Sequence, residues 1–311
     1  MAGRHPEVLF LPGRATLWPA MTGFAVRPPR RGMIPLRPGR RDREPGNNQG
    51  HAMETTGRLD RGDGIELAWS RLDGVGPTVL FLPGFRGDMT GDKATALAAF
   101  CAARGQAMLR FDYSGHGASG GQFEHGTIGM WAQDALTVLD RLTEGEVILV
   151  GSSMGGWLAL LTALKRPERI AAIVGVAAAP DFTERLMWDA MTFEERAKIM
   201  RDGILRVPSK YGEPTPITYR LIEDGRTHLL LNNPILLDCK VRLLHGQADP
   251  DVPWELALRT AERLTARDVE VILIKDGDHR LSRPRDLAVL RRTIVALLSP
   301  DGGEALAEAA V

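Results

Sequence analysis

Cysteine and net charge are both scarce in this chain of 311 residues. Only two cysteines occur, Cys101 and Cys239, which argues against a disulfide-stabilised scaffold and favours a reducing compartment. The 39 basic side chains balance 39 acidic ones, so the chain has no overall attraction to nucleic acid or to an anionic membrane. The remaining composition is ordinary, because 44% of residues are hydrophobic and 25% are charged, as in globular proteins. Such a length allows one large α/β domain or two small ones.

Long hydrophobic runs are also missing. The longest uncharged stretch, Val147–Leu164, has a Gly-Ser-Ser-Met-Gly-Gly sequence near its centre, which indicates a turn between two buried elements rather than a membrane span. The apolar run Val8–Leu11 is shorter than the core of about 7–15 residues that a signal peptide needs. We therefore expect a soluble intracellular protein without a nucleic-acid partner or stable membrane insertion. A cytoplasmic, bacterial-like location is expected, and the mitochondrial matrix is left open.

Residues 1–52 differ in composition from the rest of the chain. The first 50 residues contain nine Arg and eight Pro but no Ser, a composition that argues against a mitochondrial transit helix. Such a segment buries too little apolar surface to offset its ordering entropy, so residues 1–52 are predicted to be a disordered Arg/Pro-rich extension. Arg outnumbers Lys by 33 to 6, which is the bias of a GC-rich genome. In such a genome, non-coding sequence upstream of a gene would also translate into Arg, Pro and Gly, so Met53 is an alternative start.

From Ile65 onward, short apolar runs alternate with helical periodicities such as Ile128, Trp131, Ala135 and Leu139 on one face. This alternation predicts that residues 53–311 form an α/β domain with a mostly parallel, doubly wound sheet. The expected strands are Ile65–Ser70, Thr78–Leu82, Ala107–Asp112, Glu146–Val150, Ile170–Val176, Val241–His245 and Val269–Ile274.

One segment, at about residues 180–234, interrupts the alternation. It has no convincing strand pattern, but it contains several large apolar residues among charges. We predict a helical cap inserted between two strands and lying over the ends of the sheet. Trp188 and Met191 are candidates for lining an acyl channel, because methionine adapts to chains of varied length. The alternative is that these side chains only pack the cap onto the sheet.

The most informative stretch is Val147–Gly156, which predicts a strand, a Gly-x-Ser-x-Gly sequence and then a helix. This order is typical of a nucleophile elbow, in which a strained turn exposes the serine hydroxyl and the glycines leave room for neighbouring backbone. The pattern makes Ser153 the candidate nucleophile. The N–H of Met154, at the positive end of the helix, is a candidate oxyanion donor. A glycine-rich turn with incidental serines is the alternative.

A serine nucleophile needs a histidine base and an acid that orients it. The order Ser, Asp, His along the chain favours His279, which follows the last expected strand. Asp249 is the favoured acid, and Asp181, after the expected strand Ile170–Val176, is the runner-up. Asp251 is expected to cap the following helix instead. The loop after the first core strand should provide the second oxyanion donor, and the Phe85 N–H, just after a Pro-Gly pair, is the candidate.

Other glycine and histidine patterns point to different functions only weakly. Gly115–Gly120 matches a dinucleotide-binding pattern, but a polar, glycine-rich loop separates it from the next helical stretch. His116, His125 and His279 lack the spacing of metal ligands, so no metal is expected. His245 ends an expected strand and is interpreted as a structural histidine.

Taken together, several segments resemble the α/β-hydrolase superfamily from about residue 65 to 298. They are Phe81–Phe85, Arg110–Gly115, Ile148–Leu158, Val207–Tyr211, Arg242–Trp254 and Asp278–Arg280. Within the superfamily the chain is similar to the family of mitochondrial palmitoyl-protein thioesterases and mycophenolic acid acyl-glucuronide esterases with their bacterial relatives. In this superfamily a histidine is common at the position before Gly84. A proline, Pro83, replaces it here, as in that family. Residues 1–50 carry no such resemblance, so mitochondrial targeting is not implied.

The resemblance implies an α/β-hydrolase fold with Ser153 as nucleophile, Asp249 as acid and His279 as base. It further implies hydrolysis of carboxylic esters or thioesters, from small molecules or acylated proteins, without a metal or organic cofactor. It also suggests that cap cations such as Arg185 contact an anionic head group. A non-catalytic binding module of the same fold is the alternative, followed by a nucleotide-dependent reductase. The oligomeric state is left open.

Overall fold

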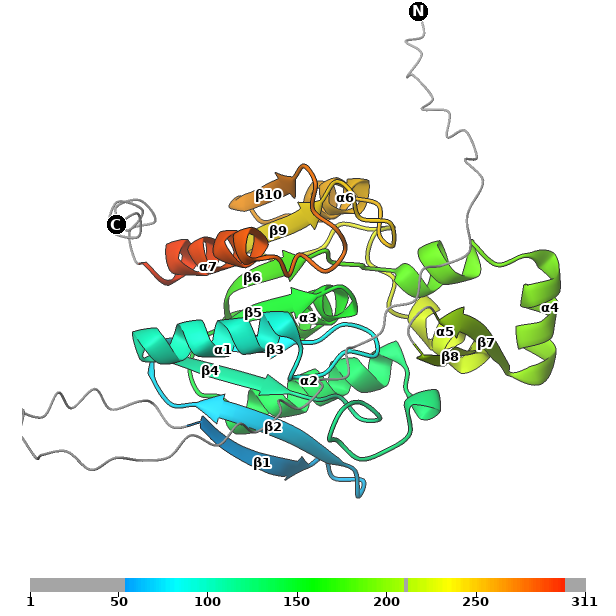
Figure 1. The fold of residues 1–311 in the computed structure, drawn as a ribbon, viewed down its shortest axis with the longest axis horizontal. Coiled ribbons are helices and arrows are strands. Elements are labelled where there is room, and N and C mark those ends of the chain that lie inside the picture. Colours follow the sequence, from blue (N-terminus) through cyan, green and yellow to red (C-terminus); the bar gives the residue numbers. More distant parts are fainter. Residues whose placement is uncertain (1–53, 210–211, 300–311) are drawn as a thin grey trace, which may run out of the picture.

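The computed structural model describes residues 54–209 and 212–299, and the expected extension 1–52 lies outside them. In the described part, a central sheet carries helices on both faces (Figure 1). The eight strands of this sheet are β1 (Glu54–Asp60), β2 (Glu66–Leu72), β3 (Val75–Leu82), β4 (Gln106–Phe111), β5 (Val147–Ser152), β6 (Ile170–Val176), β9 (Lys240–Gly246) and β10 (Val269–Ile274).

The strand order in the sheet is β1-β2-β4-β3-β5-β6-β9-β10. The pairs β1–β2 and β2–β4 are antiparallel, and every pair from β4 to β10 is parallel. The predicted mostly parallel, doubly wound sheet is therefore confirmed. Because neighbouring parallel strands end at one edge, the loops that follow β3, β5, β6, β9 and β10 gather there.

Two layers of helices cover the sheet because its strands are apolar on both faces. In β3, Val79 and Phe81 pack into one buried cluster, whereas Leu80 and Leu82 pack into the other. The first face is covered by α1 (Asp92–Arg104) and α7 (Pro284–Leu298), and the second by α2 (Ile128–Leu142), α3 (Met154–Lys165) and α6 (Glu255–Arg263). None of the helices in the described ranges is long and apolar enough to cross a membrane.

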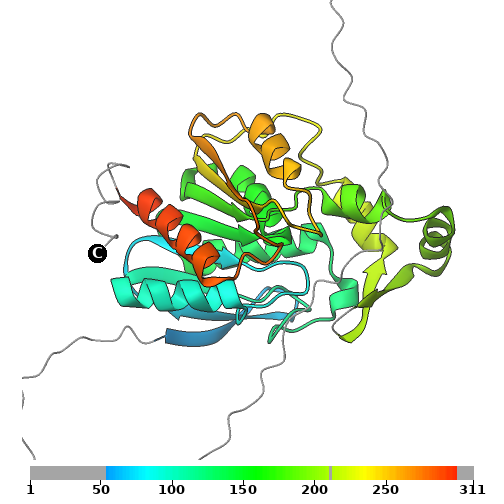
Figure 2. The same ribbon diagram turned by 45° about the horizontal axis from the view of Figure 1, so that its top comes forward.

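The segment between β6 and β9 projects beyond the sheet, as Figure 2 shows. It contains the π-helical turn η3 (Thr183–Trp188), α4 (Phe193–Asp202), β7 (Ile204–Ser209), β8 (Gly212–Thr218) and α5 (Tyr219–Arg226). The expectation that this segment holds no strand is wrong, because β7 and β8 pair as an antiparallel hairpin. Prolines and charged residues hide these strands from a periodicity search, and each strand finds its partner locally.

Candidate active site

Ser153 occupies a sharp turn between β5 and α3. Its backbone angles are φ 54° and ψ −117°, a conformation that costs a residue with a side chain about 1–3 kcal/mol. The flanking glycines make the turn possible, since a Cβ atom on Gly151 would collide with the carbonyl oxygen of Gly155, and one on Gly155 with that of Leu82. The predicted strand–turn–helix arrangement around Ser153 is thus present.

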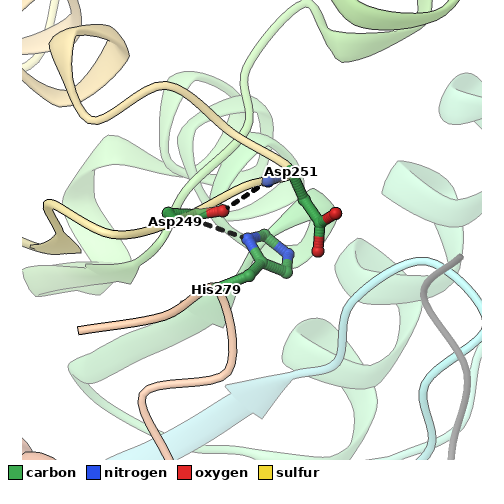
Figure 3. A group of neighbouring side chains, drawn as sticks. All are labelled: Asp249, Asp251 and His279. Atoms are coloured by element: carbon green, nitrogen blue, oxygen red, sulfur yellow. Dashed lines mark hydrogen bonds and ion pairs between the residues drawn. The ribbon is translucent and has the colours of Figure 1, made fainter. Parts of the chain in front are cut away.

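The loops after β9 and β10 bring Asp249 and His279 together (Figure 3). Backbone contact holds the two loops against each other, because the Ala248 N–H donates to the Gly277 carbonyl oxygen at 2.9 Å. The His279 Nδ1–H then donates to Asp249 Oδ2 at 2.8 Å. A carboxylate without its proton only accepts hydrogen bonds, so the proton of the neutral imidazole lies on Nδ1.

His279 also reaches Ser153. Its Nε2 lies 3.1 Å from Ser153 Oγ, and since Nδ1 carries the proton, Nε2 accepts from the serine hydroxyl. The structure therefore brings Ser153, His279 and Asp249 into one hydrogen-bonded chain. In this arrangement the imidazole can take the hydroxyl proton and the carboxylate can stabilise the imidazolium that results.

The carboxylate of Asp249 is buried and accepts four hydrogen bonds. Oδ1 accepts from the N–H groups of Asp251 and Val252 at 2.8 and 2.9 Å. Oδ2 accepts from His279 and lies 3.2 Å from His245 Nε2. Burial by itself would raise the pKa of Asp249, but the hydrogen bonds from His245 and His279 outweigh it, so its pKa lies well below the usual range. Asp249 is therefore ionised at neutral pH.

His245, interpreted from the sequence as a structural histidine, also contacts the acid. It is fully buried at the end of β9, and its Nε2–H is shared between Asp249 Oδ2 and the Val252 carbonyl oxygen, 3.0 Å away. The only signal in the sequence is that His245 and Asp249 follow the same strand four residues apart. That spacing does not distinguish a histidine that contacts the acid from one that packs in the core.

One expected oxyanion donor, Met154, follows Ser153 in the sequence, and the turn that carries the other packs close to Ser153. Met154 is the first residue of α3, where backbone N–H groups are unpaired within the helix. Phe85 follows β3, and the adjacent Gly84 is so close that a Cβ atom on it would lie 3.4 Å from Ser153 Cβ. The Phe85 ring is buried against three aromatic rings, which hold the turn in place.

Trp188 and Met191, the candidate channel residues, lie in the segment between β6 and β9. The Trp188 ring faces two guanidinium groups, those of Arg196 at 5.2 Å and Arg226 at 4.6 Å from the ring centroid. Met191 is half-buried against the main core cluster. These contacts account for packing within the segment, and a role in substrate binding stays a prediction.

Asp181 and Arg185, a second candidate acid and a candidate head-group contact, have other partners. The Asp181 carboxylate is buried and accepts from the N–H groups of Leu230 and Leu231 at 2.8 and 2.9 Å. Arg185 donates to Asn232 Oδ1 at 2.9 Å and lies 3.5 Å from Asp181. Asp181 thus ties the two ends of the insertion together, whereas Asp249 is the acid that contacts His279.

A cavity of about 530 Å³ separates the β7–β8 hairpin from the loops that follow β3 and β4. Its lining is mixed, with two guanidinium groups, two carboxylates, an aromatic ring and prolines. The lining residues are Arg86, Gly115, His116, Gly117, Gln122, Phe123, Glu124, Arg206, Glu213, Pro214 and Pro216. The cavity therefore lies beside the turn that carries Phe85, and Ser153, His279 and Asp249 are not part of its wall.

Potential metal ligands meet at one place in the described ranges. Single ligand atoms of Asp249, Asp251 and His279 lie within 4.8 Å of one another (Figure 3). The hydrogen bond between His279 and Asp249 already uses two of these groups, so an ion here would compete with that pair. The donor set can bind a divalent cation, but its observed hydrogen bonding is that of an acid–base pair.

The glycine pattern Gly115–Gly120 forms a closed loop and does not lead directly into an α-helix. The Gly115 N–H donates to the Gly120 carbonyl oxygen at 2.8 Å, and α2 begins only at Ile128. A dinucleotide site needs the glycines at the helix N-terminus, where backbone N–H groups bind phosphate. The arrangement therefore does not favour nucleotide binding.

A parallel sheet with a strained serine at its elbow, and an imidazole hydrogen-bonded to the serine hydroxyl, is the arrangement of an α/β-hydrolase. The chain belongs to the α/β-hydrolase family, and the model described as "alpha/beta hydrolase fold" matches residues 77–202. The mitochondrial palmitoyl-protein thioesterase ABHD10 of Homo sapiens is 41% identical over 242 residues, which cover 77% of this chain and 79% of that protein.

Solved structures give the same result. The mouse alpha/beta hydrolase domain-containing protein 10 is 41% identical with a TM-score of 0.73, covering 78% of this chain and 98% of that one. A putative hydrolase from Agrobacterium vitis is 40% identical with a TM-score of 0.76, covering 79% of this chain and 100% of that one. The predicted family and hydrolase activity are therefore confirmed. The relatives named palmitoyl-protein thioesterase are mitochondrial by name, and the cytoplasmic location expected here stays a prediction.

Proposed function

We propose that this hydrolase cleaves acyl esters and thioesters through a Ser153–His279–Asp249 triad and a covalent acyl-enzyme. The observation that carries the proposal is the continuous hydrogen-bonded path from the serine hydroxyl through the imidazole to an ionised carboxylate. A binding module of the same fold has no need for a strained serine with a base on its hydroxyl. The proposed catalytic role accounts for both features.

In the first half of the reaction, Ser153 Oγ attacks the acyl carbonyl carbon while His279 Nε2 takes the hydroxyl proton. The negative charge that develops on the carbonyl oxygen is stabilised by the N–H groups of Phe85 and Met154, the latter at the positive end of α3. Collapse of the tetrahedral intermediate breaks the bond to the leaving thiol or alcohol. His279 returns the proton to that leaving group, and the acyl group stays on Ser153.

In the second half, a water molecule attacks the acyl-enzyme. His279 takes a proton from this water and then passes it to Ser153 Oγ, so that the fatty or carboxylic acid leaves and the enzyme is restored. Asp249 stays ionised throughout and stabilises the imidazolium twice per cycle. Each half-reaction therefore uses the same three side chains.

The proposed substrates are acyl thioesters, including acylated proteins, with carboxylic esters as a second class. Support comes from relatives named palmitoyl-protein thioesterase that are 41–43% identical over 77% of this chain. Trp188 and Met191 remain our candidates for contacting the acyl chain and Arg185 for an anionic group. We draw the substrate class from the relatives, because the triad alone is common to many acyl transfers.

Labelling with a fluorophosphonate probe and hydrolysis of a palmitoyl thioester test the mechanism. Ser153→Ala should abolish labelling and lower kcat by about 10⁴–10⁶-fold, since the triad acts as a unit. Ser152→Ala is the matched control, because Ser152 is an adjacent buried serine that is not at the centre of the elbow, and it should keep activity within about threefold. Retained hydrolysis in Ser153→Ala would overturn the mechanism.

A further inference from the structure

Phe85 belongs to a strained turn next to the proposed nucleophile. The Gly87 N–H donates to the Gly84 carbonyl oxygen at 2.9 Å and closes a β-turn with Phe85 and Arg86 at its centre. Arg86 has φ +60°, and a positive φ at the third position of a turn is the type II conformation that favours glycine. Rotation of the peptide between Phe85 and Arg86 would give a type I turn without that strain. Some other contact must therefore hold the peptide as it is.

The contact made by the strained peptide itself is a hydrogen bond to a buried histidine, whereas the Arg86 side chain donates to Thr215 Oγ1 at 2.7 Å. The Arg86 N–H, which belongs to the strained peptide, donates to His116 Nε2 at 3.3 Å. The other ring nitrogen, Nδ1, donates to the Ser114 carbonyl oxygen at 3.2 Å. The two partners require the neutral tautomer with its proton on Nδ1. Burial lowers the pKa of His116 to about 4, so Nε2 is available as an acceptor at neutral pH.

Aromatic packing prevents the His116 ring from moving independently of Phe85. The His116 ring contacts Tyr113, Phe123 and Trp131 at centroid distances of 5.7, 5.1 and 5.1 Å. Phe123 and Trp131 also contact the Phe85 ring, at 5.0 and 5.9 Å. The acceptor and the turn that it holds are thus parts of one buried cluster.

We infer that His116 is a positioning residue for hydrolysis. It holds the peptide between Phe85 and Arg86 in its strained orientation and so fixes the conformation of the turn. The preceding peptide of this turn, between Gly84 and Phe85, carries the N–H that is directed at the oxyanion. His116 is 30 residues from Arg86 in sequence and acts only through this peptide, not on the substrate. The inference rests on the proposed function, because an oxyanion forms only if the serine attacks a carbonyl.

Two substitutions at His116 separate the acceptor from the packing. His116→Phe keeps an aromatic ring but has no acceptor, so kcat should fall about 10–100-fold with KM within about threefold, as expected for a weakened oxyanion donor. In His116→Gln the amide oxygen can replace Nε2, and most of the activity should return. Leu139→Ala, a truncation deep in α2, is the control for lost stability and should leave kcat nearly unchanged below its melting temperature.

A double-mutant cycle with Arg86→Gly gives the sharper test. Glycine adopts a φ near +60° without strain, so the turn would no longer depend on the acceptor. The loss in kcat from His116→Phe should therefore shrink to less than about threefold in the Arg86→Gly background. A histidine that only supports the core predicts the same loss in both backgrounds, and that result would overturn the inference.

The same measurements distinguish failure of this inference from failure of the proposed function. If Ser153→Ala is inactive while His116→Phe keeps its kcat within about twofold, only the positioning role is lost. If Ser153→Ala remains active, no serine-derived oxyanion forms, and both proposals are overturned.

Discussion

Replacing Asp249 by asparagine should reverse the proton arrangement of the proposed triad. Oδ1 accepts two backbone hydrogen bonds, from Asp251 and Val252, so the amide oxygen of an asparagine is held on that side. The amide NH₂ must then face His279 Nδ1 and His245 Nε2, both of which donate to Oδ2 in the parent protein. Two donors cannot face each other, so His279 must move its proton from Nδ1 to Nε2.

With its proton on Nε2, His279 would donate to Ser153 and could not accept its proton. A triad with the wrong tautomer loses about 10⁴-fold in kcat in serine proteases, or roughly 5 kcal/mol of transition-state stabilisation. We expect a loss of that order for Asp249→Asn, with little change in KM. The fold should survive, because the asparagine preserves the shape of the side chain and both backbone hydrogen bonds.

The assay is steady-state hydrolysis of an acyl thioester from pH 6 to 9, together with the rate of fluorophosphonate labelling and circular dichroism. Asp181→Asn is the control because Asp181 was the other candidate acid. Its carboxylate holds the Leu230 and Leu231 N–H groups, so its substitution should lower stability more than the chemical step. Near-normal activity in Asp249→Asn combined with an inactive, folded Asp181→Asn would show that the acid is misassigned.

Three further predictions follow from the same contacts. Gly155→Ala should lower the melting temperature by about 3–10 °C and abolish labelling, because the new Cβ would meet the Leu82 carbonyl oxygen, and unchanged scanning calorimetry would contradict this. His116, with its pKa lowered from 6.5 to about 4, contributes stability that is complete above pH 6.5 and is lost as the pH falls toward 4. Lowering the pH from 7 to 5 should therefore reduce the free energy of unfolding in urea by about 2 kcal/mol more in the parent protein than in His116→Phe. Equal reductions in the two proteins would refute the lowered pKa of His116. If Trp188 lines an acyl channel, kcat/KM should rise severalfold per methylene from acetyl toward palmitoyl substrates and flatten in Trp188→Ala, whereas a flat profile in both proteins would discard the channel.

Strands that are buried on both faces could be predicted because their sequences are continuously apolar. Ile170–Val176 was expected with the bounds that the structure gives it. Val269–Ile274 was also expected with its bounds, although it is a half-exposed edge strand that contains Glu270. β1 was missed because Glu54–Asp60 is an exposed, polar edge strand that pairs only with β2. The β7–β8 hairpin was missed because prolines and charged residues interrupt its apolar pattern, although Leu205 and Ile217 are buried in the core.

The candidate site likewise contains residues that could be predicted from the sequence and contacts that could not. Ser153 could be found from sequence because the elbow needs glycines at fixed positions on both sides, and a local steric requirement leaves a local pattern. Proximity of Asp249 and His279 could be expected because each follows a parallel strand of one sheet. The contacts of His245 and His116 could not be predicted. Each depends on the partner that the fold brings to one ring nitrogen, and a lone histidine carries no sign of that partner.

The arrangement of the site follows from how its loops are tied together. The Ser153 N–H donates to the Val176 carbonyl oxygen at 2.9 Å, which joins the elbow to the end of β6. The acid and base loops are joined through Ala248 and Gly277, and the turn of Phe85 is joined to the loop after β4 through Arg86 and His116. Such short contacts leave little freedom for the groups that they position. Since preorganised donors need no reorientation as charge develops, rigidity of these loops is what the proposed chemistry requires.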